Sequence, residues 1–205
     1  MTRRSWNLKK LPTQLELIDV FQEVEGEKRP VRDWSQDESR LGLKTITRRL
    51  LTLPGVKPVG PIQWEFEAFY LYGAVEPLTG ESFFLEFSYL NHVCFQAFLT
   101  EFSKTYATSL NILQLDNGSP HLAKKLIIPE NIILLFQPSY SPDVNPIERV
   151  WQSVKDQLSW LMVETLDVLR REMDAILNSL TAECIASLTG YDFILPALKK
   201  AHLAA

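Results

Sequence analysis

Two acidic side chains in the second half of the chain stand where carboxylates could share a metal ion. Asp116 follows the apolar run Asn111–Leu115, which is typical of a strand, and precedes the turn signal Asn-Gly-Ser-Pro. Glu148 lies one turn into a helix that we expect from Ile147 to Trp160. A strand end and a neighbouring helix can bring two carboxylates together, and Mg²⁺ prefers such oxygen ligands. The pattern indicates a metal-dependent enzyme that cleaves or joins DNA strands.

A two-ion site needs a further acid, and the sequence offers two adjacent candidates. Asp37 and Glu38 follow the candidate strand Val31–Gln36 and end it. Adjacent strand residues point to opposite faces of a sheet, so only one of the two can join Asp116 and Glu148. The residue types alone leave that choice open. Two ions about 3.5–4 Å apart would activate the nucleophile and stabilise the leaving oxygen.

Each acid also has a purely structural explanation. Asp116 could form an Asx turn, and Asn117 is a typical turn residue. Asn145, the proline after it and Glu148 fit a helix N-cap, a proline in the first helical position and an acid that favours the helix dipole. His121 could point toward the site or bond to the backbone. Considered singly, each residue is explained by local structure.

The elements around these acids predict an α/β fold. Antiparallel strands come first and βα units follow, which indicates a mixed five-stranded sheet with helices on both faces and matches the ribonuclease-H-like order. The all-apolar strand Ile132–Phe136 is expected to be central and covered on both faces. Residues 1–30 are expected to form an arm or linker, and residues 31–205 one catalytic domain with C-terminal helices. The other expected elements are strands Phe66–Val75 and Glu81–Tyr89, helix Asn91–Tyr106, short helix His121–Leu126, loop Pro138–Pro146, helix Thr165–Leu180 and the segment Ala182–Leu203, packed on the core.

A basic segment separates the first two strands. Apolar and basic residues alternate in Lys44–Leu53 before the break at Pro54-Gly55, which predicts a hairpin with a basic face. Residues 1–60 hold 12 Lys/Arg against 8 Asp/Glu, whereas residues 61–205 hold 9 against 17. Positive charge therefore gathers in the first third of a chain whose net charge is −4. The predicted contacts to DNA phosphates are Arg40, Lys44, Arg48, Arg49 and, on the helix after Glu148, Lys155.

Several other classes are excluded by composition and motif. No apolar run approaches the roughly 18 residues of a membrane span. The P-loop, Rossmann and serine-hydrolase signatures are absent from the sequence. Cys94 and Cys184 lack zinc-ligand spacing and indicate a reducing compartment, so a cytoplasmic location is expected.

Three ordered blocks of the sequence resemble the mariner-like DDE transposases, in particular their bacterial insertion-sequence branch. The run Ser141–Glu148, reading SPDVNPIE and followed by Trp151 and Lys155, resembles the family signature SPDLNPIE–W–K. Leu115-Asp116-Asn117 with His121 is similar to the second acidic motif, and Gln36–Gly42 to the first. Together the blocks extend over residues 31–160.

The resemblance implies an assignment that the residue types left open. Asp37 would be the first metal-binding acid, Asp116 the second and Glu148 the third, with Glu38 beside the site but not a ligand. Asn117, His121 and Asn145 would support these ligands. The implied fold is ribonuclease-H-like, and the implied cofactor is two Mg²⁺ or Mn²⁺ ions. The implied reaction is hydrolysis at transposon ends, followed by attack of the freed 3′-hydroxyl on target DNA.

The family also implies partners. Its members usually carry an N-terminal helix-turn-helix region, which we do not find here, so a separate DNA-binding subunit or a fused N-terminal half is expected to recognise the ends. A homodimer and a nucleoid-associated location in a bacterial cytoplasm are further expectations. Two alternatives stay open: a ribonuclease-H-like nuclease without transposition, and a non-catalytic remnant that serves as a DNA-binding or dimerisation module.

Overall fold

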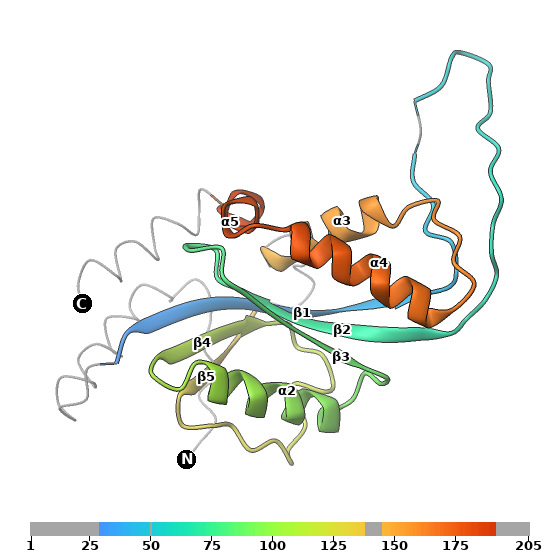
Figure 1. The fold of residues 1–205 in the computed structure, drawn as a ribbon. Coiled ribbons are helices and arrows are strands. Elements are labelled where there is room, and N and C mark those ends of the chain that lie inside the picture. Colours follow the sequence, from blue (N-terminus) through green and yellow to red (C-terminus); the bar gives the residue numbers. More distant parts are fainter. Residues whose placement is uncertain (1–28, 50, 138–144, 192–205) are drawn as a thin grey trace.

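A five-stranded mixed sheet organises the chain (Figure 1). The computed structural model describes residues 29–49, 51–137 and 145–191. The strand order is β3-β2-β1-β4-β5, which confirms the expected fold class. The elements are β1 (Val31–Gly42), β2 (Ala68–Val75), β3 (Ser82–Phe87), α2 (His92–Thr105), β4 (Leu110–Leu115), β5 (Ile132–Phe136), α3 (Ile147–Gln157), α4 (Leu166–Ser179) and α5 (Ala182–Thr189).

The sheet is antiparallel on one side of β1 and parallel on the other. β1 pairs antiparallel with β2, and β2 with β3, so the first three strands are antiparallel, as expected. β1 pairs in parallel with β4, and β4 with β5. β1 is thus the central strand, and the carboxyl ends of β1, β4 and β5 point the same way.

Helix α2 covers one face of the sheet with aromatic side chains. Its N-cap is Asn91, whose side chain accepts hydrogen bonds from the amides of Val93 and Cys94. The helix buries a row of residues at helical spacing against Trp34 and Tyr72 of the sheet. The buried helix residues are Phe95, Phe98, Leu99 and Phe102.

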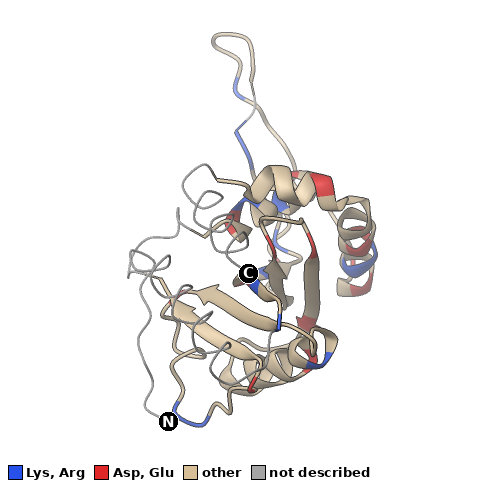
Figure 2. Ribbon diagram, turned by 90° about the vertical axis from the view of Figure 1, so that its left-hand side faces the viewer, with Lys and Arg blue, Asp and Glu red and all other residues tan. Residues whose placement is uncertain are grey.

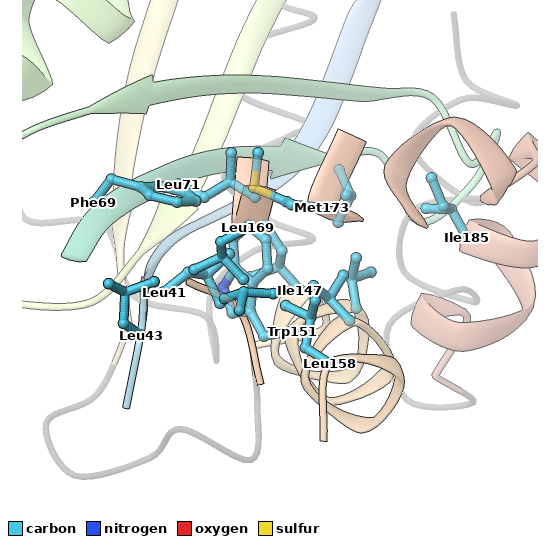
Figure 3. Close-up of a cluster of buried hydrophobic side chains, with 14 residues drawn as sticks. Leu41, Leu43, Phe69, Leu71, Ile147, Trp151, Leu158, Leu169, Met173 and Ile185 are labelled. Atoms are coloured by element: carbon cyan, nitrogen blue, oxygen red, sulfur yellow. The ribbon is translucent and has the colours of Figure 1, made fainter. Parts of the chain in front are cut away.

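Helices α3, α4 and α5 cover the opposite face, over β1 and β2 (Figure 3). Trp151 of α3 lies fully buried among these side chains. Gly73 of β2 makes room for it, because a Cβ there would lie 2.6 Å from the Trp151 ring. The labelled side chains of Figure 3 that join this core are Leu41, Leu43, Phe69, Leu71, Ile147, Leu158, Leu169, Met173 and Ile185. Helices on both faces are therefore confirmed.

Strand β1 is twice as long as the sequence suggested. We expected it to end at Gln36, with Asp37 and Glu38 closing it, but it continues to Gly42. The prediction was wrong because Ser35–Gly42 pairs with β2 along its whole length, which holds polar residues in an extended backbone. Asp37 and Glu38 consequently lie inside the central strand.

Two other expectations for this half of the fold were wrong. Ile132–Phe136 forms a strand, but β5 ends the strand order of the described residues and is an edge strand. His121–Leu126 forms successive turns and no helix. Isolated backbone hydrogen bonds, such as that from His121 N to Gly118 O, hold these turns. A helix does not form because a six-residue segment gains too few hydrogen bonds to offset the cost of helix nucleation.

The basic segment forms a projecting loop instead of a stranded hairpin. Residues 43–49 and 51–67 contain no strand, and Figure 1 shows this connection reaching away from the sheet. Two backbone bonds, Leu43 N to Glu67 O and Thr45 N to Gln63 O, tie its two arms together at the base. The chain reverses at Pro54-Gly55, where Gly55 has a φ of 84° that favours glycine.

The remaining boundaries differ by a few residues or fall outside the described ranges. Helix α3 ends at Gln157 rather than Trp160, whose φ is 62°. Of the predicted segment Ala182–Leu203, the first part is α5, and residues from 192 lie outside the described residues. Most of the predicted arm 1–30 and of the loop Pro138–Pro146 also lie outside them. None of the described helices is both long enough and apolar enough to cross a membrane.

Candidate active site

Asp37 lies on the central strand and faces helix α3. It pairs across the sheet with Gly73, and both are on the face covered by α3. The indole N–H of Trp151 donates a hydrogen bond of 3.1 Å to Asp37 Oδ2. The same tryptophan therefore packs the core and holds the orientation of the first acid. Nothing in the local sequence around Trp151 indicates this bond.

Negative charge accumulates around Asp37. Burial, the charges of Glu38 and Glu148 and, to a smaller extent, that of Asp116 together raise its pKa to about 8, against the lowering effect of a hydrogen bond from the backbone N–H of Glu38. Asp116 and Glu148, the acids of the other two motif blocks, thus lie within electrostatic range of Asp37. A divalent cation would relieve this repulsion.

Asp116 stands at the end of β4, beside Asp37. The parallel register pairs Ser35 with Gln114, and the two acids follow two residues later on their strands. Asp116 Oδ1 accepts hydrogen bonds from the Gly118 amide at 2.7 Å and from His121 Nδ1 at 2.8 Å. The bond from His121 lowers the pKa of Asp116. The predicted Asx turn is present, yet 60% of the side chain stays exposed and can reach a ligand.

His121 is buried between two carboxylates. Its Nδ1 faces Asp116, its Nε2 lies 3.0 Å from Glu38 Oε1, and its ring packs 4.5 Å from that of Phe95. Burial alone would lower the pKa of His121, but the hydrogen bonds to Asp116 and Glu38 outweigh it and raise the pKa to about 10. At neutral pH the imidazolium can donate to both partners.

The start of α3 presents Glu148 and is tied to β1 by Asn145. Glu148 is exposed in the first helical turn. The expected N-cap by the Asn145 side chain is wrong: its amide donates 3.0 Å to the carbonyl of Gln36, and no described side chain caps the start of α3. This bond uses the Asn145 side chain to fix the helix start beside Asp37. Asn117, which was also predicted to support the ligands, donates 2.7 Å to the carbonyl of Gln137, just after β5.

The five predicted DNA contacts lie on β1, on the loop and on α3. Arg40 is exposed and donates to the carbonyl of Phe66, while the Lys44 ammonium lies 4.2 Å from the ring centre of Trp64. Arg48 forms a 2.7 Å ion pair with Asp156, which joins the base of the loop to the end of α3. Figure 2 shows basic residues on this projecting loop. Exposed Arg49 follows Arg48, and half-buried Lys155 precedes Asp156.

The donor chemistry of the three acids fits a hard divalent cation. Asp37, Asp116 and Glu148 offer only oxygen ligands, the kind that Mg²⁺ and Mn²⁺ prefer. Across the three described ranges, no set of three or more His, Cys, Asp or Glu side chains is grouped closely enough to hold an ion.

Comparison with known families identifies the chain. The family model described as DDE superfamily endonuclease matches residues 32–170, which include all three acids. The chain belongs to the DDE superfamily endonucleases. A protein of Sinorhizobium fredii, "Uncharacterized protein y4pE/y4sA", is 37% identical over 93 residues, which cover 45% of this chain and 67% of that protein.

Solved structures share the fold of this DDE endonuclease. The Mos1 transposase paired-end complex with left transposon end matches with a TM-score of 0.61 at 12% identity, and the Mos1 strand transfer complex with 0.60 at 14%. The Mos1 mariner paired-end complex with Mn matches with 0.61 at 13%. Each match covers 100% of this chain, which spans 64% of the length of the Mos1 chains.

Proposed function

We propose that the chain is the catalytic domain of a transposase, which cleaves DNA at transposon ends and transfers the 3′-hydroxyl strand into target DNA. The proposal rests on the group of carboxylates around Asp37 of β1. Asp116 at the end of β4 and Glu148 at the start of α3 both lie close enough to raise the pKa of Asp37. Membership of the DDE endonucleases supports the same chemistry.

In this proposal the three carboxylates share the work of holding metal. Asp37, Asp116 and Glu148 would hold two Mg²⁺ or Mn²⁺ ions, a suggestion supported by Mos1 complexes that contain Mn and Mg. Bound metal would supply activation of the attacking oxygen and stabilisation of the leaving oxygen. Trp151 keeps Asp37 turned toward α3, and the amide of Gly118 with the ring of His121 keeps Asp116 in place.

The proposed substrate is DNA, and the proposed setting is the nucleoid of a bacterial cytoplasm. Solved complexes of Mos1 contain transposon-end DNA, which supports this substrate class. The basic residues at the base of the loop and on α3 would contact phosphates. A separate or fused helix-turn-helix unit would supply end recognition, and a second copy of the chain would pair the two ends.

The test is metal-dependent nicking of DNA by purified protein. We expect Mn²⁺-dependent activity in the wild type and losses in Asp37→Asn, Asp116→Asn and Glu148→Gln that exceed the roughly 10–100-fold typical of residues behind the ligands. Glu86→Gln, on β3, is the matched control and should nick like the wild type. Unchanged activity in all three variants would contradict the proposal.

A comparison of substrates separates transposition from plain nuclease activity. End-bearing DNA should be nicked at defined positions and joined to target DNA, whereas random DNA should not. Equal cleavage of both would favour a ribonuclease-H-like nuclease. No cleavage and no Mn²⁺-dependent rise in the unfolding temperature would favour a non-catalytic remnant.

A further inference from the structure

We propose that Glu38 is a positioning residue for Asp116 and acts on it through the ring of His121. This inference rests on the proposed function, in which Asp116 holds metal. It assigns a role to the acid that the resemblance left beside the site.

The three side chains form one hydrogen-bonded chain. Glu38 Oε1 lies 3.0 Å from His121 Nε2, and His121 Nδ1 lies 2.8 Å from Asp116 Oδ1. An imidazole bonded through both nitrogens cannot rotate about its ring axis without losing one bond. The bond to Glu38 therefore determines where Nδ1 points, and Nδ1 in turn holds Asp116.

The Glu38 side chain is anchored on the face of the sheet opposite to that of Asp37. It lies on the α2 face of β1, opposite to Asp37, and its side chain is 7% exposed. Gln36, two residues earlier on the same face, donates 2.9 Å to the same Oε1. A buried carboxylate with two donors on one oxygen is a fixed point rather than an adaptable metal ligand.

Packing removes the remaining freedom of His121. The ring is 2% exposed and lies against Phe95 of α2. Gly118 allows this approach, because a Cβ there would lie 2.9 Å from Asp116 Oδ1 and 3.2 Å from His121 Nδ1. The glycine, the histidine and the aromatic ring thus form one fitted unit behind Asp116.

The unit leaves a single oxygen of Asp116 available. Both protein hydrogen bonds end on Oδ1, and within the described residues none ends on Oδ2. The side chain is nevertheless mostly exposed. Because Oδ1 is held by the protein, Oδ2 is presented to a ligand. A change at Glu38 should therefore weaken metal affinity more than it lowers the nicking rate at saturating metal.

The experiment is a double-mutant cycle on metal affinity. Glu38→Gln, His121→Asn and the double variant are compared by the Mn²⁺ concentration that gives half-maximal thermal stabilisation and half-maximal nicking. Each single change should raise that concentration about 10-fold, and the double variant should add little, because both residues act along one path. The maximal nicking rate at saturating Mn²⁺ should fall far less. Glu86→Gln and His92→Asn are the matched controls.

Two results of the cycle would overturn the inference. Effects that multiply in the double variant would mean that Glu38 does not act through His121. Nicking lost at every Mn²⁺ concentration in Glu38→Gln, as in Asp37→Asn, would make Glu38 a ligand. Wild type that binds Mn²⁺ but nicks no DNA would overturn only the proposed function, whereas wild type that binds no Mn²⁺ would overturn both.

A measurement on the metal-free wild type tests the inference even if the variants fail to fold. Nuclear magnetic resonance of the three histidines should show one ring with both N–H protons protected from exchange with solvent, and His121→Asn should remove those signals. A His121 ring whose N–H protons exchange freely would contradict the hydrogen-bonded chain and overturn the inference.

Discussion

Trp151 serves the core and the candidate site at once. Its ring is 2% exposed and packs near Phe84, while its indole N–H donates to Asp37. Trp151→Phe should keep most of the packing and remove the donor. We expect a loss of about 1–3 kcal/mol in the free energy of unfolding, since a buried acceptor loses its partner. A chemical denaturation series measures this loss, and Mn²⁺-dependent nicking should fall with it.

Trp160 is the matched control for this prediction. Its indole N–H is buried without a hydrogen-bond partner in the described structure. Trp160→Phe removes the same atom but breaks no bond, so stability should be unchanged or slightly higher. Equal losses in the two variants would show that ring size, and not the bond to Asp37, accounts for the effect.

Asp33, away from the candidate site, should make the stability of the fold depend on pH. Burial, with the nearby charge of Glu76, raises its pKa to about 7, and its Oδ2 has no hydrogen-bond partner among the described residues. The folded-state pKa lies above the unfolded value of 3.8, so its contribution to stability is present at low pH and is lost as pH rises through about 7.

Asp33→Asn should remove this loss. Relative to wild type, the variant should gain on the order of 1–3 kcal/mol of unfolding free energy between pH 5 and pH 8. Denaturation midpoints across that range measure the gain, with Asp174→Asn, an exposed carboxyl on α4, as control. A difference from wild type that is constant with pH would contradict the shift.

The site residues divide sharply into those that a sequence can reveal and those that it cannot. Asp116 and Glu148 stand in local patterns, a strand end with a turn and a helix start, so spacing alone makes them candidates. The bond between Trp151 and Asp37 joins residues 114 apart, and that between His121 and Glu38 residues 83 apart. Only the folded sheet brings such pairs together, and no local pattern encodes them.

At the scale of elements, periodicity predicted helices better than strand limits. Helix α2 agrees with the expected range because its apolar face and its Asn91 cap are local features. The predicted range of β1 was too short because its polar residues resemble the end of a strand. A central strand that carries a site need not alternate apolar and polar residues. The outer strand β5 read as central because its apolar residues carry no sign of strand order.

The loop between β1 and β2 is expected to contribute little to stability. Large apolar side chains along it, such as Leu51, Leu53 and Val59, are exposed by 76–105%. Replacing residues 51–59 by a short Gly-Ser linker should therefore shift the unfolding temperature by less than about 2 °C, because little apolar area is lost from the core. Calorimetry measures the shift.

The base of the loop is the internal control for that deletion. The side-chain amide of Gln63 donates to the carbonyl of Val163 across the fold, and the backbone N–H of Gln63 donates to Thr45 Oγ1. Gln63→Ala breaks an anchoring bond and should destabilise by about 1 kcal/mol. A large loss from the deletion, with none from Gln63→Ala, would show that the projecting part supports the fold.

At the scale of the whole molecule, the sheet separates two tasks. Its parallel half brings the middle of β1 beside the carboxyl end of β4, and α3 adds the third acid from the covered face. Its antiparallel half carries the loop and most of the apolar core on that face. The order of elements predicted this architecture, because connection rules leave few ways to join three antiparallel strands to two βα units.

The net charge of the chain limits where DNA could bind. The chain carries a net charge of −4, so the proposed DNA binding would have to come from local cations and not from the average field. Arg40 and Arg49 are exposed near the base of the loop. If both contact phosphates, Arg40→Ala with Arg49→Ala should lower the slope of log affinity against log salt by about 1.8, since each contact contributes roughly 0.9. Fluorescence anisotropy across a salt series measures that slope.

Arg170→Ala is the control for this prediction, because Arg170 forms ion pairs with Glu86 and Asp167 on the α4 side, and the slope of this variant should match that of the wild type. An unchanged slope in the double variant would move the DNA path away from the loop, whereas a fall in both variants would mean that net charge alone governs binding.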